Sequence, residues 1–208
     1  MDTAELISAQ RAEEPIAAAA AHRKFELARP NFEASEQLLK QAQKTPRAGK
    51  RIRLILEAAD AWAAQVAPLA ACRQGCDACC HLPVAITSAE ARVLAAATGR
   101  PMTLPSNARK ISDAVSDPDE IERLATYGGR AAGPCPFLVD GQCSAYEARP
   151  AACRTHFSLA DTALLCQVID GAPASVPYAD SRQIQAFAMI LQTGEALADI
   201  RDFFSPNT

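Results

Sequence analysis

All eight cysteines of this 208-residue chain lie in one stretch, between residues 72 and 166. Four fall within nine residues and four follow at wider spacing; in order, they are Cys72, Cys76, Cys79, Cys80, Cys135, Cys143, Cys153 and Cys166. Thiols gathered in this way form disulfides, hold a metal or react, and a disulfide or a metal ties together segments that are far apart in the chain. The fold must therefore bring this stretch together around its cysteines.

The amino-terminal residues favour reduced thiols over disulfides. They mix acidic and basic side chains and contain no apolar stretch typical of a secretory signal. No apolar run approaches the roughly 18 residues that cross a bilayer. We therefore expect a cytoplasmic protein with no membrane contact, and in that compartment thiols stay reduced. Metal coordination is then the stronger interpretation of the cysteines.

The composition favours a mainly α, small single-domain protein with a cysteine-rich, metal-centred core. Hydrophobic residues make up 49% of the chain, many of them alanine, and aromatic residues only 5%; such a composition suits packed helices better than strands. We expect an N-terminal helical segment (1–70), a metal-binding core (71–170) and a C-terminal helical segment (171–208). The net charge of −3 provides no broad basic surface, so no nucleic-acid partner is expected.

Apolar periodicity and capping signals predict where the helices lie. Apolar residues recur every three or four positions over 52–69, which predicts an amphipathic helix, and Thr45 with Pro46 is expected to cap its start. Thr87-x-x-Glu90 is typical of a capping box at the start of a helix. Further helices are expected over 117–129, over roughly 159–169 with Cys166 on it, and over about 180–204, with a break near Gly194.

One short β-hairpin is expected within residues 137–143. Asp140-Gly141 is a dipeptide that readily adopts the positive φ angles of a tight two-residue turn. The hairpin would carry Cys143 on its second strand and leave Cys135 just before its first. A turn at this point would therefore bring two of the cysteines close together.

Two geometries of residues 72–80 remain open. On a helix, at about 100° per residue, the four cysteines of this segment would project from one side. In a loop, Gly75 would let the backbone fold around a metal. In both geometries the sulfur atoms of the four cysteines can lie close together. Because neighbouring side chains diverge, Cys79 and Cys80 indicate either a second metal or a cluster large enough to be approached from two sides.

The identity of the metal also remains open between zinc and an iron–sulfur cluster, since thiolates suit both. Cys76-x-x-Cys79 is one arm of a typical zinc site, which Cys135 and Cys143 could complete. The spacing Cys72-x(3)-Cys76-x(2)-Cys79 resembles that of enzymes with one open iron in a cubane cluster, which gives a slight preference for iron–sulfur. A structural alternative, a buried apolar thiol, is strongest for Cys166.

Cationic and nitrogen-containing side chains lie beside the cysteines in sequence. Arg73, Arg149 and Arg154 could offset the negative charge of thiolate-bound metal. His81 and His156 are open as nitrogen ligands, against the alternative of ordinary hydrogen-bonded residues. No triad-like arrangement of serine and histidine is visible, so no catalytic residue is predicted.

Several blocks of the chain together resemble a known family. They are Cys76-x(2)-Cys79-Cys80, Cys135-Pro136-Phe137-Leu138, Gly141-x-Cys143-x-x-Tyr146 and Arg149-Pro150-x-x-Cys153-Arg154. In this order they resemble the YkgJ-type cysteine-cluster proteins, whose domain is described as zinc- or iron-chelating. The family motif begins C-x(2)-C-x(2)-C-C, whereas the first gap here holds three residues.

The resemblance implies a cysteine-cluster metal-binding protein with an undefined cellular role, in metal handling or redox chemistry. A flagellin lysine methylase is similar to the family in the cluster region, which implies an iron–sulfur-dependent enzyme as an alternative. A structural zinc module that presents a surface to an unknown protein partner is another. Whether the protein is an enzyme stays open; a metal ion is the expected partner, and an unknown protein partner also stays open.

Overall fold

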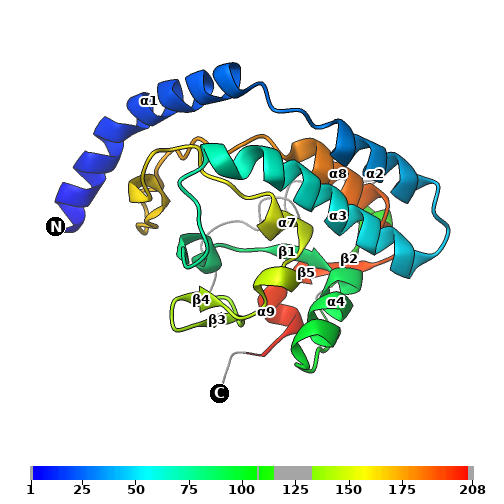
Figure 1. Cartoon of the computed structure of the whole chain (residues 1–208). Coiled ribbons are helices and arrows are strands. Elements are labelled where there is room, and N and C mark those ends of the chain that lie inside the picture. Colours follow the sequence, from blue (N-terminus) through cyan, green and yellow to red (C-terminus); the bar gives the residue numbers. More distant parts are fainter. Residues whose placement is uncertain (1, 107, 115–132, 206–208) are drawn as a thin grey trace.

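The structure, a computed structural model, describes residues 2–106, 108–114 and 133–205. Helices dominate it and surround a small antiparallel sheet (Figure 1), so the prediction of a mainly α, small single-domain protein is confirmed. Within the described residues, no helix combines the length and the hydrophobicity needed to cross a membrane. The helix expected over 117–129 lies outside the described residues.

Three helices make up the amino-terminal part: α1 (Thr3–Ala28), α2 (Glu33–Gln43) and α3 (Ala48–Val66). A capping box between Asp2 and Glu5 begins α1, which runs along the outer edge of the molecule (Figure 1). The prediction that Thr45 caps α3 is wrong. Its hydroxyl donates instead to the carbonyl of Gln41, 2.7 Å away, at the end of α2, and α3 begins without a side-chain cap.

The predicted apolar stripe is confirmed as the buried face of α3. Its core residues are Ile52, Leu54, Ile55, Leu56, Ala58, Ala59, Trp62 and Val66. Trp62 lies between two rings, with centroid distances of 5.9 Å to Phe32 and 6.2 Å to Phe157. Because Phe157 belongs to the cysteine-containing stretch, this cluster joins α3 to that part of the chain.

The short elements of the middle of the chain follow α3. They are η1 (Ala67–Leu69), η2 (Ala78–His81), β1 (Ala85–Thr87) and α4 (Ser88–Thr98). The capping box of Thr87 and Glu90 is confirmed, because each side chain accepts from the backbone N–H of the other residue. Gly99, with φ 70°, ends α4 in the left-handed conformation that favours glycine.

A three-stranded antiparallel sheet crosses the middle of the fold in the order β1-β5-β2. Its other two strands are β2 (Arg109–Lys110) and β5 (Ala196–Asp199). The chain passes from β2 directly into the short helix α5 (Ile111–Ala114). The prediction of a helix over 180–204 is therefore wrong in part. That segment forms α8 (Arg182–Ile190), β5 and α9 (Ile200–Phe203).

Pairing with β1 explains why β5 is a strand. Ile86 faces Ala198 and Thr87 faces Leu197, and all four side chains are buried. The apolar spacing from Leu197 onward is compatible with a helix, but the sheet satisfies the backbone groups of both strands at once. Strand β1, 110 residues earlier in the sequence, thus determines that this segment forms a strand. The spacing of apolar residues within the segment itself gives no sign of that partner.

The predicted hairpin is confirmed as β3 (Leu138–Val139) and β4 (Gln142–Cys143). Asp140 and Gly141 have φ angles of 48° and 72°, the left-handed values of a tight turn. The hairpin projects at the lower edge of the molecule in Figure 1. Phe137, at its base, packs edge-on against Phe204 with ring centroids 4.8 Å apart.

The last cysteine-bearing elements are short: η3 (Tyr146–Ala148), α7 (Ala151–Arg154) and η4 (Leu164–Cys166). The prediction of a helix over 159–169 is therefore wrong beyond the single turn of η4. Gln10 of α1 donates hydrogen bonds to the carbonyls of Leu164 and Gln167, and so takes up acceptors on both sides of Cys166. Contacts with α1, rather than a regular helix, hold this segment.

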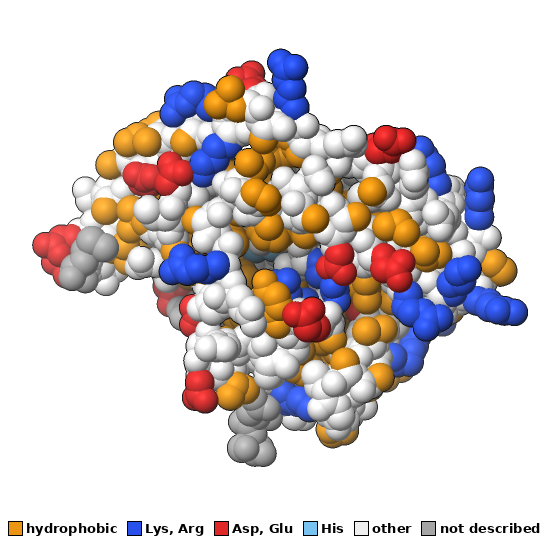
Figure 2. All heavy atoms as spheres, viewed as in Figure 1, with side chains coloured by type: hydrophobic (Ala, Val, Ile, Leu, Met, Phe, Trp, Pro, Cys, Tyr) orange, Lys and Arg blue, Asp and Glu red, His pale blue; other side chains and the backbone are white. Residues whose placement is uncertain are grey.

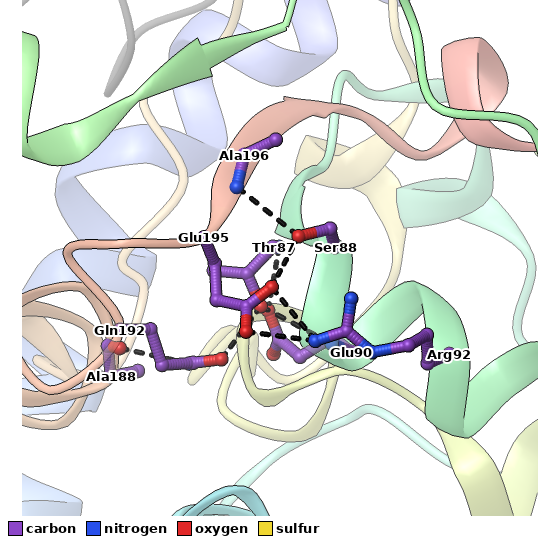
Figure 3. Close-up of polar contacts among 8 residues, drawn as sticks. All are labelled: Thr87, Ser88, Glu90, Arg92, Ala188, Gln192, Glu195 and Ala196. Carbon is purple, nitrogen blue, oxygen red and sulfur yellow. Dashed lines mark hydrogen bonds and ion pairs between the residues drawn. The ribbon is translucent and has the colours of Figure 1, made fainter. Parts of the chain in front are cut away.

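A polar network joins β1 and α4 to the chain between α8 and β5 (Figure 3). Thr87 donates to Gln192, and Ser88 and Arg92 both bond Glu195. Glu90 also accepts from the backbone N–H of Ala151, 2.9 Å away, at the start of α7. The buried Glu90 carboxyl therefore fixes α7, with its Cys153, against the start of α4.

Candidate metal centre

Seven of the eight cysteines line one cavity of about 440 Å³. They are Cys72, Cys76, Cys79, Cys80, Cys135, Cys143 and Cys153. They come from the loop and turn before β1, from the β3–β4 hairpin and its base, and from α7. The structure thus brings together thiols that are up to 81 positions apart, as the clustering of cysteines in the sequence predicted.

The loop geometry of residues 72–80 is the one the structure adopts. Cys72 and Cys76 lie in irregular backbone around Gly75, whose φ of 90° favours glycine. Cys79 and Cys80 lie on the single turn of η2. Four cysteines on one face of a helix, the other geometry left open by the sequence, is therefore wrong.

Cys166 does not line the cavity, although the structure brings it near Cys72 through Ser158. The backbone N–H of Ser158 donates to the sulfur of Cys72, 3.3 Å away, and the Ser158 hydroxyl forms a hydrogen bond with Cys166. Nothing in the sequence around Ser158 indicates this role, because its partners are 86 and 8 positions away. Ser158 is thus a site residue that only the fold identifies.

The vicinal pair shares a hydrogen bond between its sulfurs. The thiol of Cys80 donates to the sulfur of Cys79, which lowers the pKa of Cys79 to about 7 and raises the pKa of Cys80. Arg149 also favours the thiolate of Cys79. Cys79 is therefore the thiol best prepared to bind a cation, because metals bind the thiolate form.

Burial raises the pKa of several other thiols on the cavity wall. This holds for Cys72, Cys135 and Cys143, and most strongly for Cys153. All eight cysteines are free thiols. A metal that binds them must displace their protons, which is the usual behaviour of thiolate sites.

The arginines predicted beside the cysteines have different positions. Arg73 and Arg149 line the cavity, and Arg149 stacks on Tyr146 with 3.6 Å from its guanidinium carbon to the ring centroid. Arg154 pairs instead with Asp60, 2.5 Å away, on α3. A further arginine, Arg201 of α9, lies close enough to Cys135 to favour its thiolate. No sequence signal pointed to Arg201, which is 66 positions from that cysteine.

Of the two candidate histidines, His156 lines the cavity and His81, although described, is not among its lining residues. The Nε2 atom of His156 is buried without a hydrogen-bond partner in the described part of the chain. Its ring packs on Tyr178 with centroids 4.2 Å apart, and burial lowers its pKa. A neutral imidazole with an unused nitrogen at this wall suits a metal or a bound ligand.

The cysteine side chains are suitable ligands for a zinc ion or an iron–sulfur cluster. They lie around the whole cavity and do not converge on one position. Soft thiolates are the ligands that zinc and iron–sulfur clusters share. Among the described residues, no group of three or more His, Cys, Asp or Glu side chains is arranged to hold a metal ion. The cavity of about 440 Å³ is more than ten times the roughly 30 Å³ that a water occupies in the liquid.

A second cavity, of about 260 Å³, adjoins the first. The two share Cys79, Val84, Cys153 and His156 in their walls. The rest of the second wall is largely apolar and comes from the segment before β1, from β1 and β5, and from α4, α7 and α8. Figure 2 shows hydrophobic side chains, a class that includes cysteine, at the centre of the viewed face, with arginine or lysine side chains beside them.

Comparison with known proteins identifies the family of this cysteine-rich part. Neither the curated proteins nor the solved structures contain a match. Residues 71–186, by contrast, match the family CxxCxxCC, described as "Putative zinc- or iron-chelating domain". The resemblance seen in the cysteine blocks is thereby confirmed. Because the match covers more than half of its 208 residues, the chain belongs to the CxxCxxCC family of zinc- or iron-chelating domains.

Proposed function

We propose that this protein binds a polynuclear iron–sulfur centre and acts as a redox-active metalloprotein. The observation that carries the proposal is the cavity of about 440 Å³ bordered by seven cysteines. A single zinc ion with four thiolates at about 2.3 Å needs no such volume. The proposed ligands come from the full set of eight: Cys72, Cys76, Cys79, Cys80, Cys135, Cys143, Cys153 and Cys166.

The surroundings of the cavity support a negatively charged cluster. The guanidinium group of Arg149 on the cavity wall and that of Arg201 near Cys135 would offset charge on thiolates and sulfide. The N–H of Ser158 already donates to the sulfur of Cys72. A bound cluster would supply one-electron transfer, and hydrogen bonds to sulfur together with burial set the potential of such clusters.

Anaerobic purification of the full chain tests the proposal. Iron, zinc and acid-labile sulfide are measured per chain, and a visible spectrum is recorded before and after dithionite. We expect iron and sulfide together, with visible absorption that dithionite bleaches. A colourless protein with stoichiometric zinc and no sulfide would overturn the iron–sulfur assignment. That result would instead favour the structural zinc module, in which the bound metal contributes on the order of 10 kcal/mol to the free energy of folding.

A second candidate function, an iron–sulfur-dependent enzyme, is supported by the second cavity. Its volume of about 260 Å³ is just below the roughly 300–1,000 Å³ usual for small-molecule sites. It shares Cys79, Cys153 and His156 with the cysteine cavity, so a small apolar substrate there would adjoin the metal centre. Met189→Trp on its wall should fill the space.

The two proposed functions predict different effects of filling the second cavity with Met189→Trp. If the protein only carries electrons, Met189→Trp should leave cluster content and reduction by dithionite unchanged. If it is an enzyme, small apolar probes such as 1-hexanol should perturb the visible or paramagnetic spectrum of the wild-type centre. The same probes should have no effect on Met189→Trp. Spectra of the wild type that do not respond to the probes would remove the support for the enzyme.

A further inference from the structure

His156 lies where three hollow spaces meet. It borders the cysteine cavity, the second cavity and a hollow of about 380 Å³ that is open at the surface. Polar side chains on the wall of this surface hollow include Tyr178, Asp180 and Ser181. Gln185 of α8 borders both the surface hollow and the second cavity. His156 and Gln185 therefore stand between solvent and the second cavity.

The wall of the second cavity provides no fixed positive charge and no free carboxylate. Among the described residues that border it, none is a lysine or an arginine, and Glu90 carries the one carboxyl group. The oxygens of Glu90 accept from the N–H and the hydroxyl of Thr87 at 2.9 and 3.1 Å, and from the N–H of Ala151 at 2.9 Å. A charged ligand buried here would leave water without compensation. The cavity therefore favours an uncharged ligand.

The volume of the second cavity limits the size of that ligand. A cavity of about 150 Å³ lined by apolar side chains is large enough to bind benzene. By the same ratio, the volume of about 260 Å³ holds a ligand of about ten non-hydrogen atoms. Most of the wall is apolar and includes Leu82, Val84, Ala188, Met189 and Leu197. A carbon ring or a short carbon chain suits such a space.

One polar group on the ligand would find a partner in His156. The Nε2 atom of His156 is buried and has no hydrogen-bond partner among the described residues, which is uncommon for a buried polar atom. A hydroxyl group on the ligand would supply that partner. Because a hydroxyl both donates and accepts, it suits the neutral ring whether or not Nε2 carries the proton.

We propose that the second cavity binds a small, uncharged alcohol or phenol, which enters through the surface hollow and forms a hydrogen bond with Nε2 of His156. This assignment rests on the second candidate function, since that function already requires the second cavity to take a small molecule. Cys79 and Cys153, which border both cavities, would place the bound molecule beside the cysteine cavity.

The test compares four probes that share a benzene ring: benzyl alcohol, toluene, benzoate and benzylamine. Each is titrated at neutral pH into the full chain, purified anaerobically, and binding is followed by saturation-transfer NMR of the probe. Benzyl alcohol and toluene should bind. The anion benzoate and the protonated benzylamine should not, because the cavity compensates neither charge. Met189→Trp, which fills the cavity, should abolish the binding of both neutral probes.

His156→Phe isolates the hydrogen bond. The variant keeps a ring but loses Nε2, so the affinity for benzyl alcohol relative to toluene should fall about tenfold, the effect of about one hydrogen bond. His156→Gln, which keeps a polar group, should restore part of that ratio. The matched control is His22→Phe, because His22 is 73% exposed and pairs with Glu26 on α1. It should leave the ratio unchanged, and circular dichroism establishes that each variant folds.

The possible failures are distinguishable. An unchanged ratio in folded His156→Phe would overturn the role of Nε2, and loss of metal from that variant would assign the nitrogen to the metal centre instead. Charged probes that bind as tightly as benzyl alcohol would overturn the choice of an uncharged ligand. No binding of any probe would overturn the second candidate function as well. Iron, zinc and sulfide, measured on the same preparation, test the iron–sulfur proposal independently of these outcomes.

Discussion

Arg201 donates a hydrogen bond of 2.9 Å from its Nη2 atom to the carbonyl oxygen of Cys80. The same nitrogen donates to the carbonyl of Leu82 at 3.1 Å. Arg201 also pairs with Asp199 at 3.0 Å, and Asp199 accepts from the N–H of Val84 at 2.7 Å. The start of α9 is therefore bound to both ends of the segment that joins η2 to β1.

Removal of this guanidinium should destabilise the fold and disturb the vicinal cysteines. The side chains of Arg201 and Asp199 are only 13% and 11% exposed, and breaking such a pair leaves a nearly buried charge at a cost of about 3 kcal/mol. Arg201→Ala should lower the free energy of unfolding in urea by about that amount and reduce the amount of metal that the protein binds.

Arg182→Ala is the matched control, since Arg182 pairs with Asp180 with 89% and 59% of the side chains exposed. Because solvent screens this exposed pair, its loss should leave the free energy of unfolding close to that of the wild type. Equal destabilisation by the two variants would contradict the role assigned to Arg201. Full metal content in Arg201→Ala would show that the Cys80 backbone is held by other contacts.

Gly141 should be intolerant of a side chain because of its backbone angle and not because of crowding. Its φ is 72°, and a Cβ added at this position would approach only Asp77, at an ordinary 4.0 Å. The left-handed conformation costs an L-residue roughly 1–2 kcal/mol, so Gly141→Ala should lower the unfolding free energy by that amount. Metal bound at Cys143, two residues on, should be lost at a lower urea concentration.

Gly194→Ala provides the comparison. Gly194 has open space around its Cα and no left-handed φ, so alanine there should be neutral or should stabilise by up to about 1 kcal/mol. Both variants are compared with the wild type by urea unfolding followed by circular dichroism. A Gly141→Ala protein as stable as Gly194→Ala would mean that the Asp140-Gly141 turn is not as described.

The elements that the sequence predicted well are those specified by neighbouring residues. The α3 stripe, the Thr87–Glu90 capping box and the Asp140-Gly141 turn each depend on side chains at most a few turns apart. Strand β5 depends on β1, more than a hundred positions earlier, and was predicted as a helix. Turn η4 depends on Gln10 in the same way.

The same distinction applies to the site. The cysteines themselves indicate a shared centre, because few other roles explain so many thiols in one stretch. Their arrangement depends on the bond from Ser158 to Cys72 and on the bond from Cys135 to Cys80. These contacts join segments between 55 and 86 positions apart, which spacing alone cannot pair. The contacts of Arg201 with the cysteine region cannot be predicted from the sequence for the same reason.

Glu90 and Glu195, both drawn in the network of Figure 3, should affect the pH dependence of stability in opposite directions. Burial raises the pKa of Glu90 above its ordinary 4.5. Its contribution to stability is therefore complete below about pH 4.5 and is lost as the pH rises through the raised value. Despite some burial, bonds from Ser88 and Arg92 lower the pKa of Glu195, whose contribution is present above about pH 4.5 and lost in acid.

The corresponding glutamine variants separate the two effects. As the pH rises from about 3 to about 8, the stability of the wild type relative to Glu90→Gln should fall above about pH 4.5, whereas relative to Glu195→Gln it should rise up to about pH 4.5. Thermal unfolding of metal-free, reduced protein at fixed ionic strength measures both. Curves for Glu90→Gln and wild type that stay parallel across this range would show that Glu90 titrates normally.

Gln10 should control the accessibility of Cys166. Its side chain is 2% exposed and donates to the carbonyls of Leu164 at 3.0 Å and Gln167 at 2.8 Å. Each such bond contributes about 0.5–1.5 kcal/mol, and about 1.4 kcal/mol changes a population tenfold. If local opening exposes Cys166, Gln10→Leu should raise its alkylation rate roughly tenfold.

The measurement is pulsed iodoacetamide labelling of metal-free, reduced protein, with each cysteine followed by peptide mass spectrometry. Gln37→Leu is the control, because exposed Gln37 of α2 bonds only Glu33 of its own helix among the contacts described. It should label like the wild type. Faster labelling of Cys166 with an unchanged rate at Cys143 would show that α1 holds η4 locally. An equal increase at both would instead indicate global destabilisation, and no increase would show that contacts other than those of Gln10 hold Cys166.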